Sequence, residues 1–403
     1  MNHNIVIPKH IISIDDLDIS SNVLKPFSSI LIDFVNDVSK TILKDNTLRE
    51  YPELMALGFW MRKSHIKILH KHFIEQGKTK ILLGRGVVFH MAPSNVDTIF
   101  VYSWFISLLV GNSNILRISN KENMQTDILL GIIGQVLDLE KYKMLQSMIT
   151  IIKYGHDDNI TEKLSILADV RVIWGGDNTV KHIRSIPIKP TATELTFADK
   201  FSFAAVKSKK LLQDDYIDKL IESFYNDSFW FGQMACSSIR LIAWIGTKED
   251  NQKAKEIFWS RLNNYVLDKK PEEIAPADIV NKLVAECSMA IESNIMISKI
   301  DNPYINRISI SSINDVQEDL HCGTGLFYET EINKFSDLIP FMTKKHQTIA
   351  YYGYTREEII AIIQLNMPIG IDRIVPIGKA LDFSNIWDGF DLFSNFCREI
   401  EIL

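Results

Sequence analysis

The chain has 403 residues, of which 46% are hydrophobic and 23% charged, values typical of a globular protein long enough for two domains. The formal net charge of −6, with no clustered basic face, argues against nucleic-acid binding. Its four cysteines are far apart and form no Cys-x-x-Cys pair, which favours neither a disulfide framework nor a zinc site and fits a reducing cytoplasm.

The N-terminal quarter of the chain is predicted to be rich in helix. Apolar residues recur at helical spacing over 29–43 and again over 51–74. The first ten residues lack the basic-then-apolar pattern of a signal peptide. The most apolar run, 98–111, is shorter than the ~20 residues that a bilayer requires, so we expect a buried helix there and no membrane span.

From about residue 80 the sequence pattern changes and predicts short apolar strands that alternate with helices. Alternation of this kind, with strands apolar throughout, indicates an α/β fold whose parallel sheets are covered on both faces. We place a first domain at 1–202, a second at 203–370, and a C-terminal segment at 371–403. The strands of clearest pattern are 87–92, 113–119, 148–155, 169–174, 201–208 and 239–246.

A pair of glycines follows one of these strands. The segment "VIWGGDNTVKHI" places Gly175 and Gly176 between the strand and a helix that begins near Thr179. In this position a backbone can approach a pyrophosphate, and helix N–H groups point toward it. The full Gly-x-Gly-x-x-Gly fingerprint is missing, so a tight turn without a ligand is an equal interpretation.

Two other strand ends carry polar residues. Arg117 and Ser119 end the strand in "GNSNILRIS", where an arginine could meet a ribose phosphate or simply be solvated. Asn95, after Pro93 in "APSNVD", is either an oxyanion donor or a helix N-cap, and spacing alone favours the cap.

Cys236 lies in "FGQMACSSIR", among small residues and just before an apolar strand. Small neighbours give a substrate carbonyl access to the sulfur, and a turn offers the backbone N–H of Cys236 as an oxyanion donor. The plainer interpretation is a buried, inert thiol, which we expect for Cys287 and Cys397. Cys322, in "HCGTGLF", is a weaker candidate nucleophile.

In this order the motifs resemble the aldehyde dehydrogenase superfamily and, more closely, the LuxC-type long-chain acyl-CoA reductases. The resemblance covers about residues 80–403. It rests on "VVFHMAPSNVD", "GNSNILRIS", "VIWGGDNTV", "FGQMACSSIR" and the C-terminal "GIDRIVPIGKALDF…WDGFDL". It implies an aldehyde dehydrogenase-like fold, with a Rossmann-type cofactor domain, an α/β catalytic domain and a C-terminal oligomerisation strand.

The resemblance also implies a function. Members of this family reduce an acyl-CoA to the aldehyde through a cysteine thioester, with NADPH preferred over NADH. Carried over by position, Cys236 is the nucleophile and Asn95 serves the oxyanion, while Pro93, Arg117, Ser119, Gly175 and Gly176 lie at the cofactor. Homo-oligomers, and complexes with acyl-transferase or acyl-activating partners, are implied as well, with the terminal "CREIEIL" joining a neighbour's sheet.

One departure from the superfamily pattern bears on the reaction. Members that release an acid use a glutamate to activate water, and if Lys200 aligns with the lysine that follows it, Thr196 occupies the glutamate's position. Glu194 is two residues away, on the same face of a strand. Aldehyde oxidation, acyl-phosphate reduction and a catalytically silent partner subunit stay open as alternatives to acyl-CoA reduction. The histidines near these motifs are His90, His182 and His321. A lone histidine is more often structural, so none is assigned as the base for Cys236.

Overall fold

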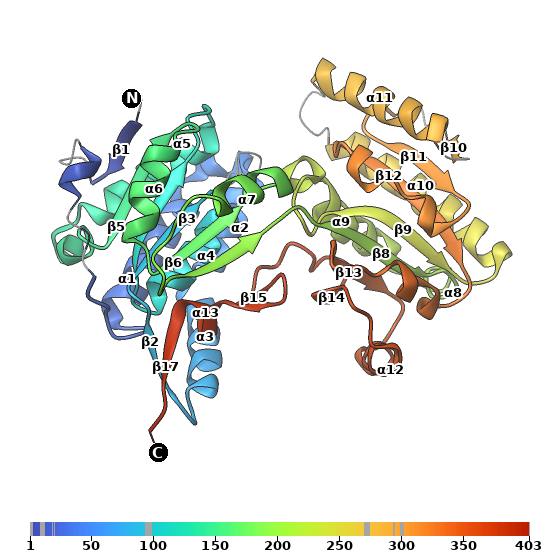
Figure 1. Ribbon diagram of the computed structural model, residues 1–403. Helices are drawn as coiled ribbons and strands as arrows, with labels where there is room; N and C mark the ends of the chain where they lie inside the picture. The colour runs from blue at the N-terminus through green and yellow to red at the C-terminus, as the bar shows by residue number, and fades with distance from the viewer. Residues whose placement is uncertain are drawn as a thin grey trace. The chain divides into compact units, whose positions relative to one another are not determined.

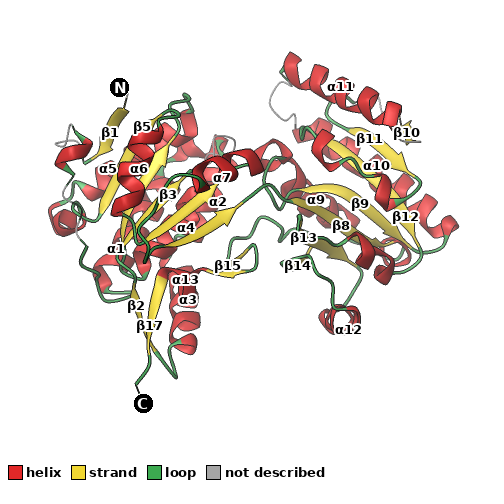
Figure 2. Cartoon of the chain, viewed as in Figure 1, coloured by secondary structure: helices red, strands yellow, loops and turns green. Residues whose placement is uncertain are grey.

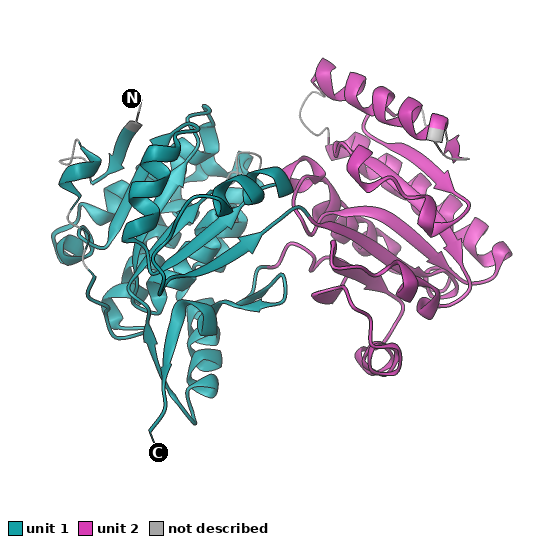
Figure 3. Ribbon diagram, viewed as in Figure 1, with its two compact units in different colours: residues 1–199, 383–403 teal, residues 200–382 magenta. Residues whose placement is uncertain are grey.

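The computed structural model describes residues 3–8, 13–17, 19, 21–92, 99–269, 275–292, 295–298 and 302–402 (Figures 1 and 2). The chain forms two compact units, each with its own sheet and core (Figure 3). Unit 1 comprises Met1–Asp199 and Phe383–Leu403, and unit 2 comprises Lys200–Asp382.

These limits differ from the domain boundaries expected at 202 and 370. The first break precedes Lys200 because β8, Phe201–Lys207, already belongs to the sheet of unit 2. The segment 371–382 also stays with unit 2, because β14, Arg373–Pro376, pairs with β13, His346–Tyr352. The chain returns to unit 1 only at Phe383.

Unit 1 is built on a sheet in the order β1-β5-β4-β3-β6-β7. All neighbours are parallel except β1, which runs antiparallel to β5. From β5 to β7 this is the order 3-2-1-4-5 of a Rossmann sheet, with β3 as its first strand. The strands are β1 His3–Ile7, β3 Val87–Met91, β4 Ser113–Ile118, β5 Ile149–Tyr154, β6 Val170–Trp174 and β7 Thr193–Phe197.

Alternate residues of each strand in this sheet face opposite cores, as the pleat of a strand requires. Val88 and Val172 pack with α1, α4 and α5, whereas Phe89 and Ile173 pack with α6 and α7. The apolar run expected to be a buried helix is α4, Ile99–Leu109, whose residues from Phe100 on are all buried. The helices of unit 1 are α1 Ser29–Lys44, α2 Pro52–Trp60, α3 Lys63–Gln76, α4, α5 Met124–Leu137, α6 Asp158–Leu167, α7 Asp177–Arg184 and α13 Leu392–Phe396.

The end of the chain forms a strand, as its alternating pattern predicts. β17, Cys397–Ile400, pairs antiparallel with β2, Ile81–Gly84, in a separate two-stranded sheet of unit 1. Lys80 and Glu399 form an ion pair beside this ribbon.

Unit 2 has a sheet in the order β10-β11-β12-β9-β8-β13-β14, parallel except for β10 against β11. One face packs against α8, α9 and α10, and the other against α11 and α12. The remaining strands are β9 Ile239–Ile245, β10 Ile295–Ser298, β11 Asn306–Ile310 and β12 Leu326–Ile332. The helices are α8 Ser208–Leu211, α9 Ile217–Phe229, α10 Lys248–Lys269, α11 Pro276–Glu292 and α12 Arg356–Asn366.

None of the helices in the described ranges is both long and apolar enough to cross a membrane. The α/β class, the parallel sheets and the covering of both faces are confirmed. A short hairpin of β15, Ile386–Trp387, and β16, Phe390–Asp391, completes the described elements of unit 1.

Candidate functional site

The cofactor residues named from the sequence gather at one edge of the sheet in unit 1. Arg117 and Ser119 lie at the end of β4, and Gly175 and Gly176 directly follow β6. Because the strands are parallel, these are carboxyl ends at the same edge. The strand order reverses between β3 and β6, which is where open α/β sheets bind ligands. Pro93 and Asn95 follow β3 in sequence but lie outside the described residues.

The glycine turn after β6 leaves open space beside Gly176 that no described side chain fills. The N–H of Gly175 donates to the carbonyl oxygen of Phe197 at 3.1 Å. Gly176 is exposed and is the N-cap of α7, with φ −64° and ψ 164°. A Cβ added to Gly176 would meet no described atom within 4 Å. Neither backbone conformation nor packing requires a glycine there, so its small size suits an approaching ligand.

Arg117 is held more firmly than the sequence suggests. Its Nη2 donates to the carbonyl oxygen of Gly155 at 3.0 Å, and its guanidinium carbon lies 5.3 Å from the centroid of the Tyr154 ring. Burial lowers the pKa of Arg117. Its Nε is buried and has no hydrogen-bond partner in the described residues. Part of the guanidinium therefore retains hydrogen-bonding capacity at the edge where a ribose phosphate was expected.

Cys236 lies at the amino end of β9 in unit 2. The N–H of Ser238 donates to the carbonyl oxygen of Ala235 at 2.9 Å and closes a turn whose second residue is Cys236. The cysteine is half-buried, whereas the two residues that follow it in the turn, Ser237 and Ser238, are buried. A turn of small residues at the start of a rigid central strand is a suitable mount for a nucleophile.

The segment that carries Cys322 packs against residues 232–234, directly before this turn. The N–H of Thr324 donates to the carbonyl oxygen of Gly232 at 2.9 Å. His321 Nε2 donates to the carbonyl oxygen of Leu326 at 2.7 Å, and its Nδ1 accepts the N–H of Gly323 at 3.2 Å. Burial lowers the pKa of His321 to about 3, so the ring is neutral and held as one tautomer. Burial also raises the pKa of Cys322, which makes it a poor nucleophile.

The other two histidines considered as bases are also engaged. His90 is fully buried, with Nε2 3.1 Å from Asn114 Oδ1, and burial lowers its pKa to about 3. His182 is exposed and lies 2.9 Å from Asp158 Oδ1. Neither contact involves unit 2, and no histidine is placed beside Cys236 by these contacts.

Glu194 and Thr196 share a face of β7, as expected, but Glu194 is committed to two arginines. Arg171 Nε donates to its Oε2 at 2.7 Å, and Arg184 Nε lies 3.1 Å from its Oε1. The Arg171 side chain is only 1% exposed, and this carboxylate compensates its buried charge. Glu194 is an ion-pair partner inside unit 1.

The remaining cysteines divide differently from expectation. Cys397 is buried, and burial raises its pKa to about 12. Cys287 was expected to be buried and inert, but it is exposed. It lies on an outward face of α11 with Ile279, Leu283 and Ile291, because only the opposite face, with Ala285 and Met289, packs on the sheet.

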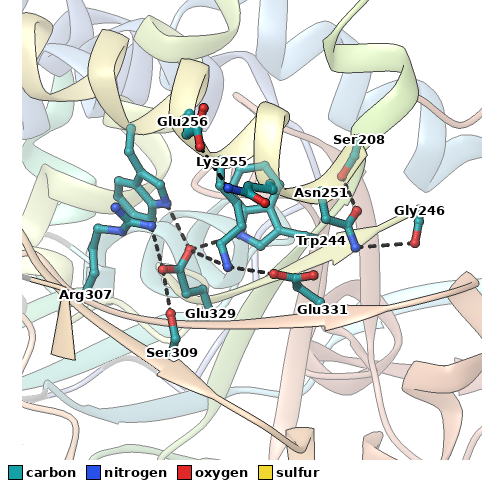
Figure 4. Close-up of polar contacts among 12 residues, drawn as sticks. Ser208, Trp244, Gly246, Asn251, Lys255, Glu256, Arg307, Ser309, Glu329 and Glu331 are labelled. Atoms are coloured by element: carbon teal, nitrogen blue, oxygen red, sulfur yellow. Dashed lines mark hydrogen bonds and ion pairs between the residues drawn. The ribbon is translucent and has the colours of Figure 1, made fainter. Parts of the chain in front are cut away.

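A second polar cluster of unit 2 is centred on Glu329, in the middle of β12. The carboxylate of Glu329 is fully buried, and it accepts from Trp244 Nε1 at 3.2 Å and Trp259 Nε1 at 3.0 Å (Figure 4). Arg307 Nη2 and Ser309 Oγ donate to its other oxygen at 2.7 and 2.9 Å (Figure 4). Trp244 is near the carboxyl end of β9, whereas Cys236 precedes its amino end, so this cluster is separate from the nucleophile turn. Its contacts join β9, β11, β12 and α10 and indicate a structural role.

Comparison with solved structures defines the class of the fold. An aldehyde dehydrogenase from Physcomitrella patens superposes with a TM-score of 0.65 at 10% identity, covering 92% of this chain and 85% of that one. The glyceraldehyde-3-phosphate dehydrogenase GapN from Methanocaldococcus jannaschii, complexed with NADP, gives 0.64 at 12% identity and 92% and 88% coverage. An aldehyde dehydrogenase from Mycobacterium tuberculosis, complexed with NAD+, gives 0.62 at 11% identity and 94% and 86% coverage. The fold is that of the aldehyde dehydrogenases.

The family follows from the sequence comparisons. Residues 64–399 match the family model described as acyl-CoA reductase (LuxC), and the chain belongs to this family. It is 24% identical over 165 residues to the long-chain acyl-protein thioester reductase of Aliivibrio fischeri. That match covers 40% of this chain and 32% of the relative, about a third of its length.

Proposed function

We propose that the protein reduces a long-chain acyl thioester to the aldehyde, with Cys236 as the nucleophile and a nicotinamide dinucleotide as the hydride source. The observation that carries the proposal is the half-buried Cys236 on a closed turn at the start of β9, in a chain of the LuxC family. The curated relative is named for a long-chain acyl-protein thioester. Acyl-CoA and acyl-protein thioesters share the reacting group, so the acyl thioester is the substrate class.

The residues of unit 1 fit a dinucleotide. Gly176 leaves space at the carboxyl end of β6, and Arg117 keeps a buried, unpartnered Nε at the end of β4. Asp177 places a negative charge in the first turn of α7 and so weakens the attraction of the helix dipole for an anion. A pyrophosphate would therefore depend on the backbone N–H groups of the glycine turn. When bound, the cofactor supplies hydride to the acyl carbon. We favour NADPH over NADH because Arg117 can meet a 2′-phosphate.

Cys236 carries the covalent step. Its thiolate forms a bond to the thioester carbonyl carbon, the original C–S bond breaks, and the departing thiolate takes up a proton to become a thiol. The negative oxygen formed during the attack needs neutral donors, for which we propose the N–H of Cys236 and the amide of Asn95. Reduction then breaks the bond to Cys236 and returns its thiolate.

The engagement of Glu194 favours reduction over acid release. An acyl-enzyme awaiting hydride must not be hydrolysed, and a carboxylate paired with Arg171 and Arg184 is not disposed to activate water. This argues against aldehyde oxidation, the leading alternative of the same fold.

The test uses the purified chain with tetradecanoyl-CoA and either NADPH or NADH, following the absorbance of the reduced cofactor and trapping the aldehyde. Wild type should consume cofactor and form aldehyde, while Cys236→Ala should bind cofactor but form none. Acetyl phosphate in place of the thioester tests acyl-phosphate reduction. Equal cofactor consumption by wild type and Cys236→Ala would exclude Cys236 as the nucleophile. Unreactive Cys236 together with absent cofactor binding would favour a silent partner subunit.

We further propose that the protein works in a reducing cytoplasm beside partner proteins that deliver acyl groups.

We also propose that the chain forms a homo-oligomer through its open strand edges. β14 is an edge of its sheet within the described residues and lies beside an apolar groove of about 370 Å³. Ile359, Ile363 and Ile374 line this groove. An open edge is a template for a strand of another copy, and β17 with β2 is a candidate occupant. The N–H of Ile377 donates to Tyr351 of β13, and alternate residues of a parallel strand face the same neighbour, so the N–H of Ile374 faces the open edge. Ile374→Pro should lower the mass measured by light scattering, and an unchanged mass would exclude this edge as the interface.

A further inference from the structure

The backbone before Cys236 adopts an unusual conformation. Phe231, Gly232 and Gln233 have φ of 55°, 58° and 64°, three successive residues in the left-handed region. For a residue with a side chain this region costs roughly 1 kcal/mol or more. A strained segment directly before a nucleophile persists only where surrounding contacts hold it.

Gln233 supplies those contacts on one side of the turn. Its side chain is fully buried, and its Nε2 donates to the carbonyl oxygens of Ile239 at 2.8 Å and Leu326 at 3.0 Å. Its Oε1 accepts the N–H of Gly325 at 2.9 Å. Both amide hydrogens and the amide oxygen are used, so one side chain joins the turn to the first residues of β9 and β12.

Ser202 holds the other side. Its Oγ donates to the carbonyl oxygen of Cys236 itself at 2.6 Å and accepts the N–H of Thr348 at 3.0 Å. The β8–β9 pairing shifts register between Ser202 and Phe203, and the β8–β13 pairing shifts between His346 and Ile349. Irregularities of this kind often re-aim side chains next to active sites. Here they free the Thr348 N–H and bring the Ser202 hydroxyl to the cysteine.

We propose that Ser202 and Gln233 are positioning residues that set the orientation, and hence the reactivity, of the Cys236 thiol. The proposal rests on Cys236 being the nucleophile. Ser202 fixes the carbonyl of Cys236 while Gln233 fixes the strained segment that leads into the turn. Together they determine where the thiol and the N–H of Cys236 point. Neither side chain is proposed to touch the substrate.

The principal variant is Ser202→Ala, with Ser202→Thr as the conservative rescue. The matched control is Ser238→Ala, because the Ser238 hydroxyl is buried on the same turn and makes no hydrogen bond among the described residues. Three quantities are measured: the rate of alkylation of Cys236 by iodoacetamide, read by peptide mass spectrometry, and kcat and KM for tetradecanoyl-CoA. Gln233→Met is the second variant, which removes all three bonds without adding a charge.

For Ser202→Ala we expect alkylation and kcat to fall about fivefold to tenfold, the worth of one hydrogen bond, with KM nearly unchanged. The alkylation should follow a single exponential, and the Tm should stay close to that of wild type, which together show that one folded population reacts more slowly. Ser202→Thr should recover most of the rate, and Ser238→Ala should match wild type. Gln233→Met should lower both rates further.

Wild-type rates in Ser202→Ala, or an equal loss in Ser238→Ala, would overturn the proposal. A fast second phase of alkylation from unfolded molecules in Ser202→Ala and Gln233→Met, with a normal rate for the folded molecules, would show a purely structural role and would also overturn it. These outcomes are distinct from failure of the proposed function, which would be seen as full activity in Cys236→Ala.

Discussion

Arg171 and Glu194 lie directly opposite each other on β6 and β7, and the Arg171 guanidinium donates to the Glu194 carboxylate at 2.7 Å. The arginine also donates to Ser165 Oγ and to the carbonyl oxygen of Ile186. The buried charge of Arg171 is thus hydrogen-bonded to α6, to β7 and to the loop after α7 in unit 1. Glu194, the carboxylate two residues from the position expected for a water-activating glutamate, instead links β6 and β7 through its ion pair with Arg171.

Glu194→Gln should therefore act on stability and leave chemistry unchanged. Removing the charge leaves the buried guanidinium of Arg171 uncompensated, which costs about 3 kcal/mol. Denaturant unfolding measures this cost, and Asp158→Asn, which removes an exposed partner of His182, should change stability by less than about 0.5 kcal/mol. Slower release of acid from the acyl-enzyme, with stability unchanged, would show that Glu194 is a base after all.

Gly176→Val tests the cofactor site separately from the fold. The φ and ψ of Gly176 are open to valine, and its Cβ would meet no described atom, so we expect a change in Tm below about 2 °C. The branched side chain would occupy the space proposed for the pyrophosphate, so the Kd for NADPH should rise at least tenfold. Titration calorimetry measures the Kd, with Lys181→Ala on the exposed face of α7 as control. Unchanged affinity would mean that the turn binds no dinucleotide.

Asp227 predicts a pH dependence of stability in unit 2. It is buried on α9 and accepts the N–H groups of Gly378 and Ala380, which hold the segment after β14. Burial raises its pKa to about 7, and these N–H donors oppose the shift only in part. Between about pH 4 and pH 7 the carboxyl group of Asp227 is protonated in the folded state but ionised in the unfolded state, so unfolding releases a proton in this window. The free energy of unfolding should fall as pH rises through that window, by at most about 1.4 kcal/mol per unit.

Asp227→Asn replaces the carboxyl group with a neutral amide that does not titrate, so this variant serves as the reference. Unfolding by urea at pH 5, 6, 7 and 8, at constant ionic strength, should show wild type losing stability relative to the variant up to pH 7 and not beyond. A constant difference between the two proteins across the series would contradict the shifted pKa.

Glu329 and Glu331 offer a matched pair on β12. Lys255 lies between the two carboxylates, 3.9 Å from Glu329 Oε2 and 3.0 Å from Glu331 Oε1 (Figure 4). Glu329 is fully buried, so Glu329→Gln strands Arg307 and should cost about 3–5 kcal/mol. The Glu331 side chain is 36% exposed, so Glu331→Gln should cost less than about 1 kcal/mol. Similar losses in the free energy of unfolding of the two variants would mean that burial does not determine how much each carboxylate contributes to stability.

Much of the local structure followed from pattern. The apolar runs that became β3, β4, β5, β6, β8 and β9 were recognisable in the sequence, as was the buried helix α4. The turns at Gly175 and Cys236 were placed correctly between their elements. Each of these depends on residues close together in the chain, whose hydrophobic spacing and turn chemistry are local properties.

Other features were missed because their causes are distant in sequence. β1, whose apolar run at residues 5–7 is only three residues long, exists because β5 offers it an edge. The exposure of Cys287 depends on which face of α11 meets the sheet. The end of unit 2 depends on the pairing of β14 with β13.

By itself, then, the sequence determined the class of the fold, the alternation of elements and the candidate cysteine, because each is written in short stretches of the chain. Only the tertiary structure decided how the cysteine is held. Ser202 reaches Cys236 across 34 residues, and Gln233 reaches Gly325 across 92. Hydrogen bonds at such separations depend on strand order and register, which arise when the whole sheet packs.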